Sequence, residues 1–106
     1  MSKYMFQVSY TQAGFQSTLN EGGTERKDAV ETTIKSLNGW MEAFYFTFGE
    51  SDMIVIAELP DNISAAAFSL IASAAGSTMI KTTILITPAE IDLAAKKASN
   101  PFGVHP

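Results

Sequence analysis

Carboxylate and aromatic side chains that could do chemistry gather in one stretch of the chain, residues 39–60. Glu50 and Asp52 lie two residues apart in the tetrapeptide 49–52, between two apolar segments. Two carboxylates at a pocket mouth can transfer protons or contact a cation, but hard cations take about six or more oxygen ligands. Glycine and aspartate are also turn residues, because an aspartate side chain accepts hydrogen bonds from nearby amides. We interpret the tetrapeptide chiefly as a turn and keep Asp52 as a ligand-binding candidate.

Three more candidates lie in the two flanking segments. Tyr45 is the strongest, because it is central in the aromatic segment and its hydroxyl could orient a flat organic molecule. Trp40 could add an aromatic wall to the same pocket. Glu58 stands in an otherwise aliphatic segment, and burial would raise its pKa and suit it to act as a general base. The alternative is structural, since strands favour aromatic residues and Glu58 would be hydrated or paired at an open strand end.

The composition excludes several classes of function. The chain has 106 residues, which fits a single domain, expected over residues 1–99, and it has no cysteine for thiol chemistry or metal binding. Its formal charge of −4 and its scattered basic residues argue against a nucleic-acid partner. No apolar run reaches the roughly 18–20 residues of a membrane span, and no signal peptide precedes the first strand pattern. The only histidine, His105, is penultimate. We therefore expect a cytoplasmic protein with no metal, cofactor, nucleic-acid or membrane partner.

The hydrophobic periodicity predicts the order β-α-β-β-α-β followed by a further helix. Alternating or continuous apolar runs predict strands, and apolar residues at helical spacing predict helices. A loop is expected over residues 12–23, with one helical turn at 15–19 as an alternative, and a loose tail is expected over 100–106, because both stretches contain loop-forming residues. The predicted strands span 4–11, 40–48, 53–59 and 77–86, and the predicted helices span 24–38, 62–75 and 88–99.

The spacing of apolar residues predicts which side of two of the helices faces the core. Val30, Ile34 and Leu37 form a narrow stripe in the first helix. The second helix is expected to turn a broader stripe to the sheet, formed by Ile63, Ala66, Ala67, Leu70, Ile71 and Ala74.

This order predicts an α+β, ferredoxin-like fold with a four-stranded antiparallel sheet and helices on one face. We place the first and third strands at the centre, as parallel neighbours, and the second and fourth at the edges. In the hairpin, pairing Phe48 with Met53 sets Tyr45 opposite Ile56. Both hairpin faces are then apolar, and the two helices cover only one of them. A second copy of the chain is the simplest cover for the other face, which predicts a homodimer or a higher homo-oligomer.

The hairpin and its flanks resemble the GYD-domain family of the dimeric α/β-barrel superfamily. The family pattern is an aromatic strand, Gly-x-Tyr-Asp, and an aliphatic strand that ends in Glu-x-Pro-Asp; here these are residues 44–48, 49–52 and 54–61, with Ser51 in place of the tyrosine. Tyr10-Thr11 with Gly14-Phe15, and Thr87-Pro88-Ala89-Glu90, resemble the family's first turn and closing helix. The resemblance covers about nine tenths of the chain and implies the fold and a dimeric barrel more than any chemistry.

Two functions remain open at this stage. The first is a non-catalytic or ligand-binding dimeric domain with a small apolar pocket for an apolar or aromatic ligand. The alternative is a cofactor-independent oxygenase or isomerase that acts on a flat aromatic or lactone-like substrate, as the wider superfamily suggests. In that case Tyr45 would orient the substrate, and Glu58 or Asp52 would take a proton. Whether the chain is an enzyme, and which residues would be catalytic, the sequence leaves undecided.

Overall fold

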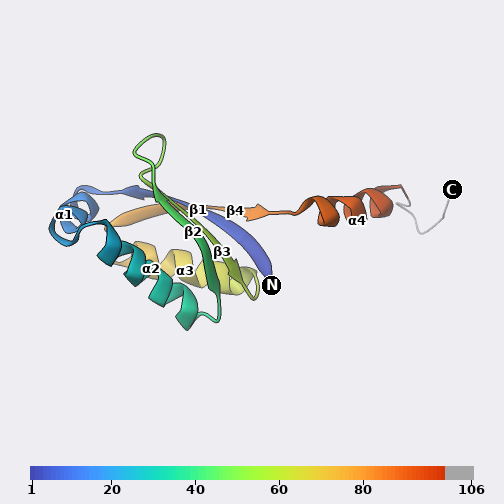
Figure 1. Ribbon diagram of the computed structural model, residues 1–106, viewed down its shortest axis with the longest axis horizontal. Helices are drawn as coiled ribbons and strands as arrows, with labels where there is room; N and C mark the ends of the chain where they lie inside the picture. The colour runs from blue at the N-terminus through green and yellow to red at the C-terminus, as the bar shows by residue number, and fades with distance from the viewer. Residues whose placement is uncertain (100–106) are drawn as a thin grey trace.

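The computed structural model describes residues 1–99, and it is a four-stranded sheet with helices on one of its faces (Figure 1). The predicted tail, residues 100–106, and with it His105, lies outside the described residues. The strands are β1 (Ser2–Tyr10), β2 (Trp40–Phe46), β3 (Met53–Leu59) and β4 (Thr78–Leu85). The helices are α1 (Gln12–Glu21), α2 (Gly23–Ser36), α3 (Asn62–Ala74) and α4 (Pro88–Ala98).

The sheet order is β2-β3-β1-β4, so the expected central and edge strands are confirmed. The expected parallel pairing of the two central strands is wrong, because β1 and β3 pair antiparallel. The reason is topological. The crossover through α1 and α2 returns the chain to β2 across the place that β3 later fills, so the parallel relation joins β1 to β2 rather than to β3. All three pairs of neighbouring strands are antiparallel, as a ferredoxin-like sheet requires.

The hairpin register differs from the expected one by two residues. Phe46 pairs with Met53 and Tyr45 with Ile54, because the connection runs from 47 to 52 rather than from 49 to 52. Phe48 has a positive φ of 47° and belongs to this connection. A shift of two residues keeps residues 43–46 on their predicted face of the sheet, because side chains alternate with a period of two. An irregularity between Met41 and Ala43 reverses the alternation before it, so Trp40 lies on the same face as Tyr45.

The core lies between the sheet and helices α2 and α3. Strands β1 and β3 alternate along their length between buried and half-buried residues, and their buried faces point to the helices. Phe6 and Phe68 are buried, and their ring centroids lie 4.5 Å apart. The predicted stripe of α2 is confirmed, since Ile34 is fully buried and Val30 and Leu37 pack beside it. The period-two and helical patterns thus locate most of the core correctly.

Two elements differ from the sequence prediction. The expected loop at 12–23 is mostly the helix α1, whose first turn is capped by Thr11 and in which Gly14 is buried. Gly14 marks a close approach and not a loop, because a Cβ there would overlap the carbonyl oxygen of Ser77. Helix α3 is rotated from the predicted orientation. Its buried residues are Ala65 and Phe68, whereas the predicted Ile63, Leu70 and Ile71 are exposed.

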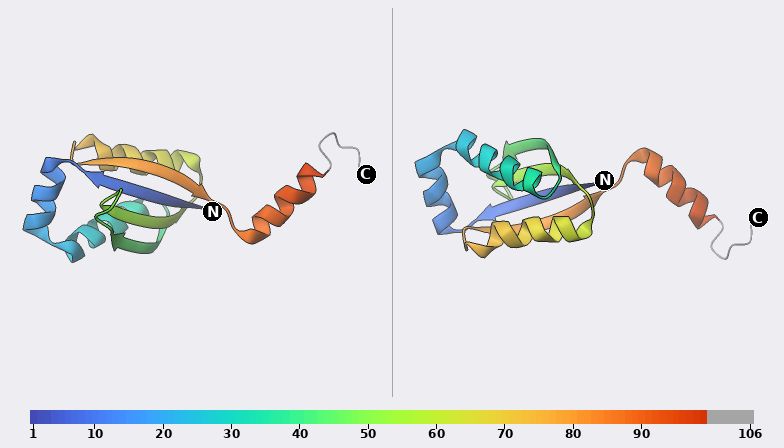
Figure 2. Two further views of the ribbon diagram at one scale, coloured as in Figure 1. Left: turned by 90° about the horizontal axis from the view of Figure 1, so that it is seen from above. Right: turned by 90° about the horizontal axis from the view of Figure 1, so that it is seen from below.

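Helix α4 extends away from the rest of the molecule (Figures 1 and 2). Its predicted capping box is confirmed, because Thr87 and Glu90 exchange side-chain and backbone hydrogen bonds and Pro88 follows the cap. All residues of α4 are exposed, including Ile91 and Leu93. Isolated helices shorter than about 12–15 residues are marginal in water, so α4 is a helix that lacks its packing surface in a single chain.

Candidate functional site

The face of the sheet opposite the helices carries three of the four candidate residues. Tyr45 pairs with Ile54, and Trp40 pairs with Glu58, so all four side chains lie on this open face. Tyr45 and Trp40 are 69% and 66% exposed. Glu58 is half-buried and lies opposite Lys3 on β1. Because Ile54 and Glu58 are four residues apart, Tyr45 and Glu58 are separated by about 13 Å along the strands.

The open face divides into an apolar half and a polar half. Its apolar half spans β2, β3 and β1 and contains Ala43, Tyr45, Ile54, Ile56 and Met5, linked through the cross-strand pairs Ala43–Ile56 and Ile56–Met5. The polar half lies toward β4 and includes Gln7 paired with Lys81. None of the helices lies over this face (Figure 2, left). Aromatic and aliphatic side chains on an uncovered sheet are typical of a surface that meets another molecule.

Asp52 lies apart from these residues and braces the end of the hairpin. Its Oδ2 accepts a hydrogen bond of 2.8 Å from the backbone N–H of Tyr10, and its own N–H donates to the Val8 carbonyl at 2.8 Å. Both bonds tie the start of β3 to the end of β1. The carboxylate therefore acts as a backbone acceptor, as aspartate commonly does in turns.

Ser51 is buried in the same connection between β2 and β3, and its carbonyl oxygen accepts two hydrogen bonds within it. It is 8% exposed, and its carbonyl oxygen accepts from the Thr47 hydroxyl at 2.7 Å and from the Gly49 N–H at 2.8 Å. Its hydroxyl lies 3.4 Å from the Thr47 hydroxyl. A small polar side chain fits this buried position, and the Gly49–Ser51 and Thr47–Asp52 backbone hydrogen bonds close the loop.

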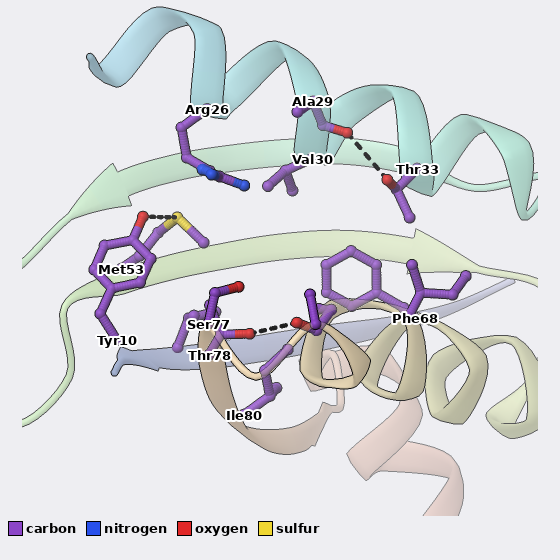
Figure 3. Close-up of a pocket in the computed structure, with 14 residues that line it drawn as sticks. Tyr10, Arg26, Ala29, Val30, Thr33, Met53, Phe68, Ser77, Thr78 and Ile80 are labelled. Atoms are coloured by element: carbon purple, nitrogen blue, oxygen red, sulfur yellow. Dashed lines mark hydrogen bonds between the residues drawn. The ribbon is translucent and has the colours of Figure 1, made fainter. Parts of the chain in front are cut away.

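A cavity of about 200 Å³ lies on the other side of the sheet, between α2 and α3 (Figure 3). Its floor comes from the helix-facing side of β1, β3 and β4, and β1 is visible between the two helices from below (Figure 2, right). Most of its wall is apolar. The lining residues are Val8, Tyr10, Arg26, Ala29, Val30, Thr33, Met53, Phe68, Ile71, Ala72, Ala75, Ser77, Thr78 and Ile80. An apolar cavity of about 150 Å³ is large enough to hold benzene, so this one accommodates a single ring.

The Tyr10 hydroxyl and the Arg26 guanidinium differ from the threonine hydroxyls of this cavity, because each has a donor without a strong acceptor. The Thr33 and Thr78 hydroxyls donate to the helix carbonyls of Ala29 and Ala72. The Tyr10 hydroxyl, in contrast, donates only to the thioether sulfur of Met53, at 3.9 Å. Sulfur is a weak acceptor, so this hydroxyl is a donor without a strong partner.

The second is the Arg26 guanidinium, which points from α2 toward the sheet (Figure 3). Its Nη2 donates to Ser17 and to Glu21, with an Arg26–Glu21 distance of 3.0 Å. Its Nε is buried and has no hydrogen-bond partner among the described residues. Tyr10 and Arg26 thus give an otherwise apolar cavity two incompletely used donors, which suits recognition of an oxygen acceptor.

Sequence reasoning missed this cavity, because its lining comes from five elements spread over residues 8–80. One signal was available. Arg26 stands four residues before Val30 and therefore continues the apolar stripe of α2, where a charged residue is unexpected. A second, more open hollow of about 350 Å³ lies at the edge of β2 and is lined by Tyr45, Phe44, Phe46, Gly23, Thr24 and Lys27.

The acidic groups with a displaced pKa are helix caps and not parts of either hollow. The Ser64 N–H and hydroxyl donate to the Asp61 carboxylate and lower its pKa. The Thr87 N–H and hydroxyl lower the pKa of Glu90 in the same way. Residues 1–99 contain no group of three or more potential metal ligands. No helix within that range has the length and apolar character needed to cross a membrane.

One family model matches nearly all of the sheet and most of α4. A family model described as "GYD domain" matches residues 4–95. No curated protein and no solved structure matches the chain significantly. The match runs from β1 through the closed loop at 49–52 and into α4, and it covers both the open face and the cavity. The chain therefore belongs to the GYD-domain family, within the dimeric α/β-barrel, ferredoxin-like superfamily.

Proposed function

We propose that this protein is a homodimeric domain that binds a small apolar or aromatic molecule in the cavity between α2 and α3. The observation that carries the proposal is the cavity itself. Its volume is that of a ring compound, its wall is largely apolar and bordered by two helices and the sheet, and a few polar groups line it. These are the common features of small-molecule sites in proteins.

Binding is tested directly by methyl NMR and thermal unfolding with single-ring probes. Met53 lines the cavity, so its methyl resonance should shift on titration with a compound such as acetophenone. A ligand at ten times its Kd stabilises the native state by about 1.4 kcal/mol. For a domain of this size that raises Tm by roughly 6–11 °C.

Replacing each of two alanines of α3 by leucine tests where the ligand binds. Ala72→Leu should fill the cavity and abolish the shift, because Ala72 lines it. Ala66→Leu is the matched control, since Ala66 lies exposed on the same helix and does not line the cavity. Binding that survives Ala72→Leu, or an absence of binding by every ring probe up to its solubility, would refute the proposal.

The homodimer part of the proposal is supported by the apolar surface left uncovered. Fourteen large hydrophobic side chains are exposed among residues 1–99, more than the eleven hydrophobic residues in the core. They include Tyr45 and Trp40 on the open face, and Ile91 and Leu93 on α4. Exposed apolar area on this scale commonly marks an interface. A second copy packed on the open face would give both this surface and α4 a partner, in the closed symmetry that most homo-oligomers adopt.

Light scattering after size exclusion measures the association. A homodimer has twice the 11.4 kDa mass of one chain. Tyr45→Ser and Ile91→Ser should shift the protein toward monomer at micromolar concentration. Ile63→Ser is the matched control, because Ile63 is 80% exposed on α3, away from the open face. A wild-type protein of 11.4 kDa under these conditions would refute the homodimer.

A further inference from the structure

We infer that the ligand of this cavity is a compact ring compound that carries an oxygen acceptor, held by the Tyr10 hydroxyl and the Arg26 guanidinium. The inference rests on the proposed function and adds the chemical class of the ligand and the two residues that recognise it. The first observation is the Tyr10 hydroxyl, which is buried with its ring and has only a sulfur at 3.9 Å as acceptor. A carbonyl oxygen would be a stronger acceptor than the thioether.

The second observation is the state of Arg26. Its Nη2 is engaged with Ser17 and Glu21, while its Nε–H is buried and lacks an acceptor within residues 1–99. A buried donor without a partner costs about 1–3 kcal/mol, so the site gains when an acceptor arrives. Nε is covered by protein, so contact with a ligand oxygen requires the long Arg26 side chain to rotate.

The charge balance indicates a neutral acceptor rather than a carboxylate. Glu21 lies 3.0 Å from Arg26 and already neutralises the guanidinium. A second carboxylate would be placed near the first in a largely apolar space, where an uncompensated charge is costly. A ketone, aldehyde or lactone oxygen accepts from both donors without that cost. The remaining wall, including Phe68, Val30 and Ile80, is apolar and suits the ring.

The inference is tested with two probes of similar shape, acetophenone and isopropylbenzene, and with Tyr10→Phe. This substitution removes only the hydroxyl and leaves the ring in place. We expect the Kd of acetophenone to rise about tenfold in Tyr10→Phe and in Arg26→Met, which corresponds to loss of one hydrogen bond. The Kd of isopropylbenzene should stay within about twofold. Tyr4→Phe is the matched control, because the Tyr4 hydroxyl donates to Asn62 and lies outside the cavity lining.

The possible results separate the two proposals. If both probes bind and neither Kd depends on Tyr10 or Arg26, the acceptor class is refuted while the cavity remains a binding site. The same conclusion follows if Tyr4→Phe weakens acetophenone as much as Tyr10→Phe does. If neither these two probes nor any other ring probe shifts the Met53 methyl resonance up to its solubility, the proposed function fails, and the inference fails with it. If benzoate binds more tightly than acetophenone, the argument from charge balance is wrong.

Discussion

Gly14→Ala is the substitution for which the structure gives the sharpest prediction. Gly14 lies in the first turn of α1, where alanine is intrinsically favoured over glycine by about 1 kcal/mol. A Cβ at this position would overlap the Ser77 carbonyl oxygen and lie 2.7 Å from Cδ1 of Tyr10. Real Cβ atoms essentially never approach other atoms this closely, so α1 must move away from the turn that precedes β4.

The expected cost exceeds the gain in helix propensity. The overlap is with backbone, and that carbonyl is fixed because it accepts from the Thr11 N–H at 3.1 Å. Overpacking of this kind costs about 1–3 kcal/mol, and loss of the Thr11–Ser77 hydrogen bond adds about 1 kcal/mol. After the propensity gain, the free energy of unfolding should fall by about 2 kcal/mol. For a domain of this size Tm should then fall by roughly 8–16 °C.

Urea and thermal unfolding of Gly14→Ala and Gly49→Ala would check this value. Gly49 is the matched control, because a Cβ there meets nothing within 4 Å and its φ is not in the left-handed region. Gly49→Ala should therefore change stability by less than about 0.5 kcal/mol. If Gly14→Ala is as stable as the wild type or more stable, α1 does not dock against Ser77 as described.

Three further predictions concern the loop, α3 and its cap. Asp52→Ala should cost about 1–3 kcal/mol in urea unfolding, because it leaves the Tyr10 N–H without its acceptor, while alanine at the exposed Glu50 should be nearly neutral. Phe68→Ala should cost about 3–5 kcal/mol and Leu70→Ala almost nothing; the reverse order would show that α3 has the orientation predicted from its sequence. The folded-state pKa of Asp61 is lowered, so its contribution is present above the unfolded pKa and is lost as pH falls through the folded value. The stability difference between the wild type and Asp61→Ala should accordingly shrink in acid, and a constant difference would contradict the assignment.

The sheet could be predicted from the sequence because its signals are local. The alternation of β1, the stripe of α2 and the Thr87–Glu90 capping box each depend on residues within one element. The register of the hairpin depends instead on the length of its connection. The sequence marks Gly49 as the turn, but Phe48 adopts the left-handed backbone and Thr47 bonds across the loop, so two more residues leave the ladder.

The orientation of α3 could not be predicted from the spacing of its apolar residues, because these residues lie on more than one side of the helix. Its sequence offers several apolar faces of similar width. The face that packs against the sheet contains Phe68, whose ring contacts Phe6, and Ala65, whose small side chain lets the helix approach the sheet. Leu70 and Ile63 are exposed to solvent, and Ile71 is partly exposed at the rim of the cavity. The rotation also sets the edge of the cavity, so the only local signal for the candidate site was the charged Arg26 in the apolar stripe of α2.

Successive side chains of each strand point to opposite faces of the sheet, so the proposed ligand site and the proposed dimer interface lie on different faces. Tyr10 points to the helices and borders the cavity, while its neighbour Ser9 lies on the open face. A ligand under the helices and a second copy on the open face would therefore contact alternate residues of the same strand. The candidates Tyr45 and Glu58, on the open face, would then be interface residues, and the cavity would depend on Tyr10 and Arg26. If both proposals hold, substitutions on the two faces should break dimerisation and binding independently, which makes the two proposals separable by substitution.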